Sequence, residues 1–154
     1  MFPVLLVLLP VIIHNRYSPF MAKTWLRMIT VPGAKRVPAN ILFVLLSFFI
    51  PIYYAVIPKD WGITPSIFIV VFLWFTKISI KALRTIRRNR HLRWSMTLAC
   101  LILPFIPHLL SLTITLAFML EFSYFYPSDD MERYYDEHAD EADVDKKFIE
   151  TYFK

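Results

Sequence analysis

The chain has 154 residues, of which 57% are apolar and 17% aromatic, and only two are glycine. Soluble domains are about 45–50% apolar, and the excess here lies in nearly uncharged blocks that are long enough to cross a hydrocarbon layer of about 30 Å. The formal charge of +5 is unevenly divided: residues 1–127 hold 13 of the 17 bases, whereas residues 128–154 hold ten of the twelve acids.

This composition excludes an ordinary soluble domain and predicts an all-α integral membrane protein. We expect three to four transmembrane helices in antiparallel hairpins within residues 1–127. An amphipathic, acidic C-terminal helix is expected outside the membrane over residues 128–154.

The first apolar block, residues 2–13, is short. Twelve helical residues reach about 18 Å, and no Lys or Arg precedes them, so the basic start of a secretory signal is missing. We predict a crossing that is extended by the polar residues after it. A re-entrant or interfacial segment is the alternative.

Residues 14–40 carry five bases and no acid. Within them, Trp25, Met28 and Ile29 alternate with Lys23 and Arg27, a pattern typical of an amphipathic helix lying in the membrane interface.

Two further spans are predicted at residues 41–57 and 61–80. The connection between them, residues 58–62, is too short to allow anything but antiparallel neighbours. Pro51 lies within the first of these spans, where it removes a backbone hydrogen bond and is expected to kink the helix.

Residues 77–93 carry seven bases and no acid, and we expect them to continue the third helix out of the bilayer. Positive charge at this place satisfies the positive-inside rule. No nucleic-acid-binding fold accompanies it, so nucleic acid is not expected as a partner. Anionic lipid headgroups are the first expected partner and an acidic protein surface the second, with these contact residues: Lys77, Lys81, Arg84, Arg87, Arg88, Arg90 and Arg93.

A fourth span is predicted at residues 95–120, kinked by Pro104 and Pro107. His108 then lies near the middle of the bilayer, where an ionisable group is a functional hypothesis by default. The functional alternatives are a proton relay, a metal ligand or a substrate contact, with Ser111 one turn further on. The structural alternative is a neutral imidazole that donates to a carbonyl freed by Pro104 or to a neighbouring hydroxyl.

A possible duplication accompanies these spans. "LRMI" at 26–29 returns as "LRTI" at 83–86, and "FIP" at 49–51 returns at 105–107. Each copy would contain an apolar helix, a basic amphipathic connection and a proline-bearing span, related by an axis along the membrane normal. Chance matches in such apolar sequence are the alternative.

The acidic tail has an apolar stripe at three- and four-residue intervals, which indicates an amphipathic helix. Its acids lack the glycine and the spacing of an EF-hand, so neither a metal nor another cofactor is expected. The stripe is typical of a docking helix, and the expected docking residues are Tyr134, Tyr135, Phe148, Ile149, Tyr152 and Phe153.

No phosphate loop, metal-ligand cluster or nucleophile–base pair occurs in the sequence. We therefore predict a non-catalytic subunit of a membrane complex, which packs through its proline-kinked helices and docks a partner through the acidic tail. A small homo-oligomeric channel or transporter with His108 along its path is the alternative. Besides lipid, the expected partners are other membrane subunits or further copies of the chain.

The predicted membrane is a bacterial inner membrane or an organelle membrane. Residues 14–40 and 77–93 are expected on its cytoplasmic or matrix side. The count of spans places the C-terminal tail on the opposite side.

Overall fold

The computed structural model describes residues 19–31, 33–57, 59–141 and 143–152, with side chains from residue 23 onward. The predicted first span, residues 2–13, and Phe153 lie outside the described residues. The described regular structure is helical throughout, which confirms the all-α class for this part of the chain: α2 (Pro19–Thr30), α3 (Arg36–Val56), α4 (Ile63–Trp74), α5 (Thr76–Arg88), α6 (Arg90–Ile102), the short 3₁₀ helix η1 (Leu103–Phe105), α7 (Leu110–Ser123), α8 (Asp129–Glu137) and α9 (Val144–Tyr152).

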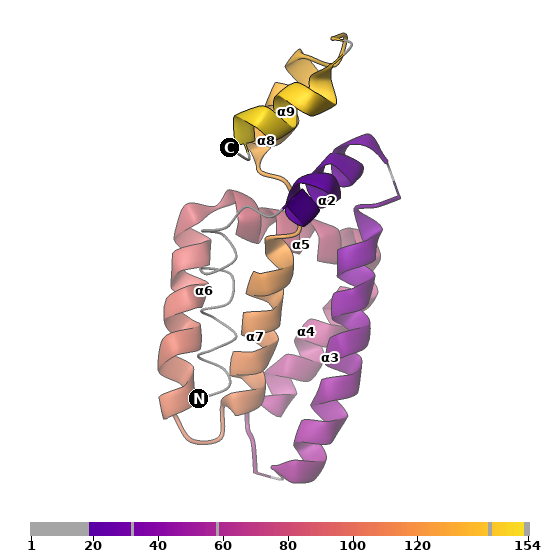
Figure 1. Ribbon diagram of the computed structural model, residues 1–154. Helices are drawn as coiled ribbons and strands as arrows, with labels where there is room; N and C mark the ends of the chain where they lie inside the picture. The colour runs from indigo at the N-terminus through magenta and orange to yellow at the C-terminus, as the bar shows by residue number, and fades with distance from the viewer. Residues whose placement is uncertain (1–18, 32, 58, 142, 153–154) are drawn as a thin grey trace.

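Two helical hairpins form the body of the molecule (Figure 1). Helix α3 packs against α4, and α6 packs against α7. Both hairpin turns lie at the lower end in Figure 1, where the Gly62 amide donates to the His108 carbonyl over 3.0 Å. Helices α2, α5, α8 and α9 gather at the other end. We call these the turn end and the charged end.

The prediction that one helix continues from the span 61–80 into the basic residues 77–93 is wrong, because α4 stops at Trp74 and α5 leaves at an angle of 112°. Phe75, between them, has an extended backbone with ψ of 95°. The chain bends where the uninterrupted apolar run gives way to bases. Beyond that point only one face of the helix is apolar, so α5 lies across the charged end and buries that face.

The predicted span 95–120 is also wrong, since it is a hairpin rather than one kinked helix. Pro107 has no amide hydrogen and disfavours helical backbone at the residue before it. Ile106 accordingly has a ψ of 117°. His108 follows in the left-handed region with φ of 68°, and the chain then returns as α7.

The extra reversal changes which end the tail occupies. Helix α7 ends at the charged end, so residues 128–152 lie beside the two basic segments (Figure 1). The structure therefore gives no support to the predicted placement of the tail on the side opposite to these segments. Residues 95–120, predicted as one kinked span, instead reverse the direction of the chain.

Helix α7 is the centre of the bundle and contacts α3, α4, α5 and α6. It approaches α6 closely because small residues meet there: Cys100 and Ala117 are buried together, and the Cys100 thiol lies 3.9 Å from the Thr113 carbonyl oxygen. A larger core cluster joins α2, α3, α4 and α5 beneath Tyr126.

The same order of elements occurs twice, as a short basic helix followed by a helical hairpin: α2–α3–α4 and then α5–α6–α7. This order differs from the predicted unit, in which a basic connection is followed by a single proline-bearing span, and the duplication stays a prediction. The "FIP" strings are placed differently, since residues 49–51 lie inside α3 and residues 105–107 lie in the turn after α6.

One described helix, α3 with 21 residues, is long and apolar enough to cross a membrane by length and composition. A second crossing is reached if α4 and α5 are taken together as one bent span. Pro51 lies inside α3, which continues past it to Val56.

Candidate functional site at the charged end

Helix α5 presents a stripe of four bases. Lys77, Lys81, Arg84 and Arg88 follow one another at intervals of four, three and four residues, which places them on one face of a helix. The opposite face is buried through Leu83 and Ile86. Because the apolar face is fixed against the bundle, the basic stripe points away from the core.

The acidic tail is held on this stripe by ion pairs. Glu132 of α8 pairs with Arg84 and, over 3.3 Å, with the Lys35 ammonium group, while Asp129 accepts from Arg88 over 2.7 Å. The Ser128 hydroxyl caps α8 by accepting from the Met131 amide. Exposed pairs stabilise weakly when isolated, but here two bases of α5 and Lys35, just before α3, converge on the first turn of α8.

A hydrophobic cluster fixes the tail more firmly than the charges do. Trp25 of α2, Met131 of α8 and Phe148 of α9 are buried together. The Trp25 indole donates to the Tyr124 carbonyl over 3.1 Å. The tail is thereby packed on α2 as a folded part of the molecule.

Arg87 fills the space beneath α2. Its guanidinium group lies 5.7 Å from the Trp25 ring centre and 5.0 Å from that of Tyr124, geometry that gives cation–π attraction. The residue is only 7% exposed, so Arg87 does not share the accessible surface of the other bases predicted to contact lipid or a partner.

Tyr126 closes the link between α7 and the start of α3. Its hydroxyl donates to the Lys35 carbonyl over 2.8 Å. Burial raises the pKa of the Tyr126 phenol to about 12, so this donor keeps its proton at neutral pH.

The other bases of the predicted lipid-contact set remain accessible. A hollow of about 350 Å³ lies along the stripe, with Lys77, Lys81, Thr85 and Ser128 among its lining residues. Among the described residues, no carboxylate lies within ion-pair distance of Lys77 or Lys81. Arg90 is exposed and Arg93 half-buried on the first turn of α6.

The turn end contains a buried acid, Asp60, which is hydrogen-bonded to both hairpin turns. The Asp60 carboxylate accepts from the Gly62 and Ser111 amides, each over 2.8 Å, and is 6% exposed. It caps the first turn of α7 from the other hairpin and so joins the two turns. This role was missed, although an acid in a turn between two apolar blocks was the available signal.

The predicted site around His108 does not form. The His108 side chain is exposed in the turn, 68° in φ, and the described residues offer its imidazole no hydrogen bond. Neither the proposed bond to a carbonyl freed by Pro104 nor a position halfway along a span is present. Ser111 is buried at the start of α7, where its hydroxyl finds no partner among the described residues.

Most of the predicted tail-docking residues are used within the chain. Phe148 is fully buried, and Tyr134, Tyr135 and Tyr152 pack around it. Ile149 is the exposed member of the set. Docking of a separate partner therefore has to use the other face of the tail. Within the described residues, no group of three or more His, Cys, Asp or Glu is placed to hold a metal ion.

No protein-family model, curated protein or solved structure matches the chain.

Proposed function

We propose that the chain is an integral membrane protein that acts as a non-catalytic subunit of a membrane complex, with its charged end in the cytoplasm or matrix. The membrane placement is supported by the surface of the helical bundle between the turn end and the charged end. Large apolar side chains are exposed on α3, α4 and α6, where a soluble protein would present polar groups: Val44, Phe48, Ile52, Ile67, Phe68, Val71, Phe72, Trp94, Leu98, Leu101 and Ile102.

Three helices of the body are too short to cross a bilayer of ordinary thickness without the turns that follow or precede them. Helices α4, α6 and α7 have 12, 13 and 14 residues, or about 18–21 Å, which is less than the hydrocarbon thickness of about 30 Å. Trp61, Phe105 and Ile106 are exposed in the turns, and they extend the apolar surface beyond the helix ends. A body of this shape favours a locally thin bilayer.

The orientation follows from the bases. The described parts of both basic segments lie at the charged end, and the described part of the turn end contributes Lys59 alone. The positive-inside rule therefore favours the cytoplasm or matrix for the charged end, and the tail is placed in the same compartment.

The role as a subunit rests on one observation, the two faces of the folded tail. Asp129 and Glu132 face inward and pair with bases of the body. Asp136, Glu137 and Asp140 are exposed, and no base of the described residues pairs with them. A rigid acidic surface of this kind suits a basic protein partner, since charge complementarity steers association.

Two experiments test the proposal in turn. Carbonate extraction of cell membranes should leave the chain in the pellet, and recovery in the soluble fraction would contradict the membrane placement. Native electrophoresis after mild detergent extraction should then show a complex with a second polypeptide. A symmetric oligomer of this chain alone would contradict the subunit role and favour the alternative of a channel. That alternative is weakened because His108, its expected path residue, lies in a turn and not within a span.

Variants of the acidic surface sharpen the second experiment. Asp136→Asn, Glu137→Gln and Asp140→Asn together should release the second polypeptide at lower salt than the wild type does. Arg133→Gln with Lys146→Gln is the control, because it removes exposed bases from α8 and α9 of the same tail and should leave the complex intact or make it more stable to salt.

A further inference from the structure

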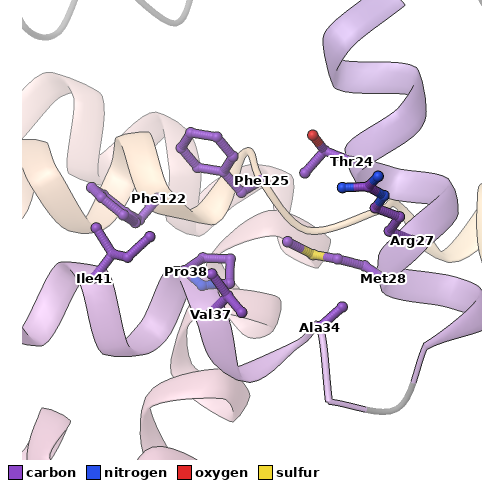
Figure 2. A pocket seen from close by; sticks show the side chains of 9 residues that line it. All are labelled: Thr24, Arg27, Met28, Ala34, Val37, Pro38, Ile41, Phe122 and Phe125. Carbon is purple, nitrogen blue, oxygen red and sulfur yellow. The ribbon is translucent and has the colours of Figure 1, made fainter.

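An apolar groove opens below α2 at the charged end (Figure 2). Its volume is about 390 Å³, within the range of about 300–1,000 Å³ that ligand sites usually have. Seven of the nine lining residues are apolar, and they come from α2, α3, the connection between them and the end of α7: Met28, Ala34, Val37, Pro38, Ile41, Phe122 and Phe125.

The groove continues into the exposed face of α3. Val37 and Ile41 line it and are 54% and 47% exposed. Val44 and Phe48 follow at helical intervals and are exposed as well. The groove is therefore the upper end of an apolar stripe that runs down α3. On the proposed membrane placement, this stripe faces acyl chains.

The two ends of the groove differ in polarity. Figure 2 shows Arg27 and Thr24 at one end and Ile41 with Phe122 at the other. Arg27 is the single charged residue of the lining and is exposed. Among the described residues, no carboxylate pairs with it. Lys23 lies one turn earlier on the same face of α2.

We propose that this groove binds one acyl chain of an anionic phospholipid from the surrounding bilayer, with the headgroup phosphate beside Arg27 and the chain along Phe122 and Ile41. The inference rests on the membrane placement proposed above. An uncharged apolar ligand would leave the guanidinium unused, and a free phosphate would leave the apolar lining unused. A bilayer lipid satisfies both and reaches the groove along α3.

The test uses the full chain in phosphatidylcholine nanodiscs with a trace of photoreactive phospholipid that carries a diazirine in its acyl chain. The probe has either a phosphatidylglycerol or a phosphatidylcholine headgroup. We expect crosslinks to the peptide with Phe122 and Phe125, in about fivefold higher yield from the anionic probe, as one well-placed base of about 1 kcal/mol would give.

Charge variants separate the headgroup from the chain. Arg27→Gln should equalise the two probes while the chain still crosslinks to the groove. Arg90→Gln, a base at the same end of the bundle that does not line the groove, should keep the preference. Equal yields from both probes with the wild type would overturn the proposal. Loss of the preference on addition of inorganic phosphate would also overturn it in favour of a free anion.

Steric variants test the chain itself. Ala34→Phe should fill the groove and remove most of the crosslink, whereas Ala55→Phe adds the same ring to an exposed site on α3 and should not. Val37→Trp gives a second test at a half-exposed position if Ala34→Phe does not fold. Undiminished crosslinking in folded variants would overturn this proposal while leaving the membrane placement intact. A chain that fractionates as soluble would overturn both.

Discussion

Gly62 has no room for a side chain. A Cβ there would lie 2.9 Å from the Asp60 Oδ1, the Ser111 Oγ and the Leu112 backbone nitrogen. Gly62→Ala must therefore push the two turns apart, and we expect a loss of about 1–3 kcal/mol in the free energy of unfolding. Thermal unfolding in detergent, followed by circular dichroism, measures it.

Gly33 provides the matched control. No atom lies within 4 Å of a Cβ built there, so Gly33→Ala should be neutral or stabilising by up to about 1 kcal/mol. If both variants melted at the same temperature, the close contact at Gly62 would be wrong.

His108 has a backbone conformation that glycine would adopt more easily. Its φ of 68° is in the left-handed region, which costs a residue with a side chain about 1–2 kcal/mol. His108→Gly should stabilise the protein by about 0.5–1 kcal/mol, because the greater freedom of glycine in the unfolded chain offsets part of the gain.

His108→Leu should leave stability nearly unchanged, since the described residues offer the imidazole no hydrogen bond. Both variants can be compared by the same unfolding measurement. A large loss with leucine, without a gain with glycine, would restore a structural role for the imidazole.

Sequence reasoning identified the unusual residues at this scale but not their partners. Pro104, Pro107 and His108 stand out within an apolar block, and they do mark a special backbone. The hydrogen bond from the Gly62 amide to the His108 carbonyl and the cap that Asp60 gives to α7 join segments about 50 residues apart. No local pattern contains such a contact.

At the scale of elements, the tail helices depend on Phe148. This ring is fully buried against Trp25 and Met131, and truncation of a buried phenylalanine costs about 3–5 kcal/mol. Helices α8 and α9 have nine residues each, and Phe148 is the residue around which their other apolar side chains pack. Phe148→Ala should therefore detach them without unfolding the body.

Hydrogen exchange measured by mass spectrometry tests this separation. Amides of residues 129–152 should exchange much faster in Phe148→Ala, while those of α3 and α7 stay protected. Ile149→Ala removes the exposed neighbour and should exchange like the wild type. Faster exchange throughout the body would show that the tail is part of a single cooperative unit.

The predictability of the elements follows their apolar pattern. The block predicted at 41–57 is α3, extended to Arg36, and the tail stripe is correctly helical although α8 and α9 are separate. The prediction of a single kinked span at residues 95–120 was wrong, because a kinked span and a tight hairpin can have the same apolar composition. The close packing of Cys100 on Ala117 decides between them, and it depends on tertiary contact.

At the scale of the whole molecule, the orientation proposed here has a direct test. In a Cys100→Ala background, Ser128→Cys and Asn89→Cys should react with an impermeant maleimide from one side of the membrane. Lys59→Cys in the turn end should react only from the other side. Both α5 and α8 lie at the charged end, so this pattern follows if the bundle crosses the membrane as proposed. Labelling of Ser128→Cys and Lys59→Cys from the same side would contradict the proposed crossing.

This sidedness could not be derived from counting apolar blocks. The described bases of the segments 14–40 and 77–93 share an end of the bundle, and their placement on one side of a membrane stays a prediction. The tail is brought to that same end by the reversal at residues 103–109. Its ion pairs with Arg84 and Arg88 show that charge complementarity between distant segments, rather than the number of blocks, indicates where it lies.

The two short turns at one end also bear on biogenesis. For a chain inserted as proposed, from residue 36 onward only the turns around Asp60 and His108 have to be translocated. Each can cross as the tip of a paired hairpin whose backbone is already hydrogen-bonded. The ten acids of residues 128–154 stay in the compartment of synthesis, so they can fold onto α2 and α5 as soon as the second hairpin has entered the lipid.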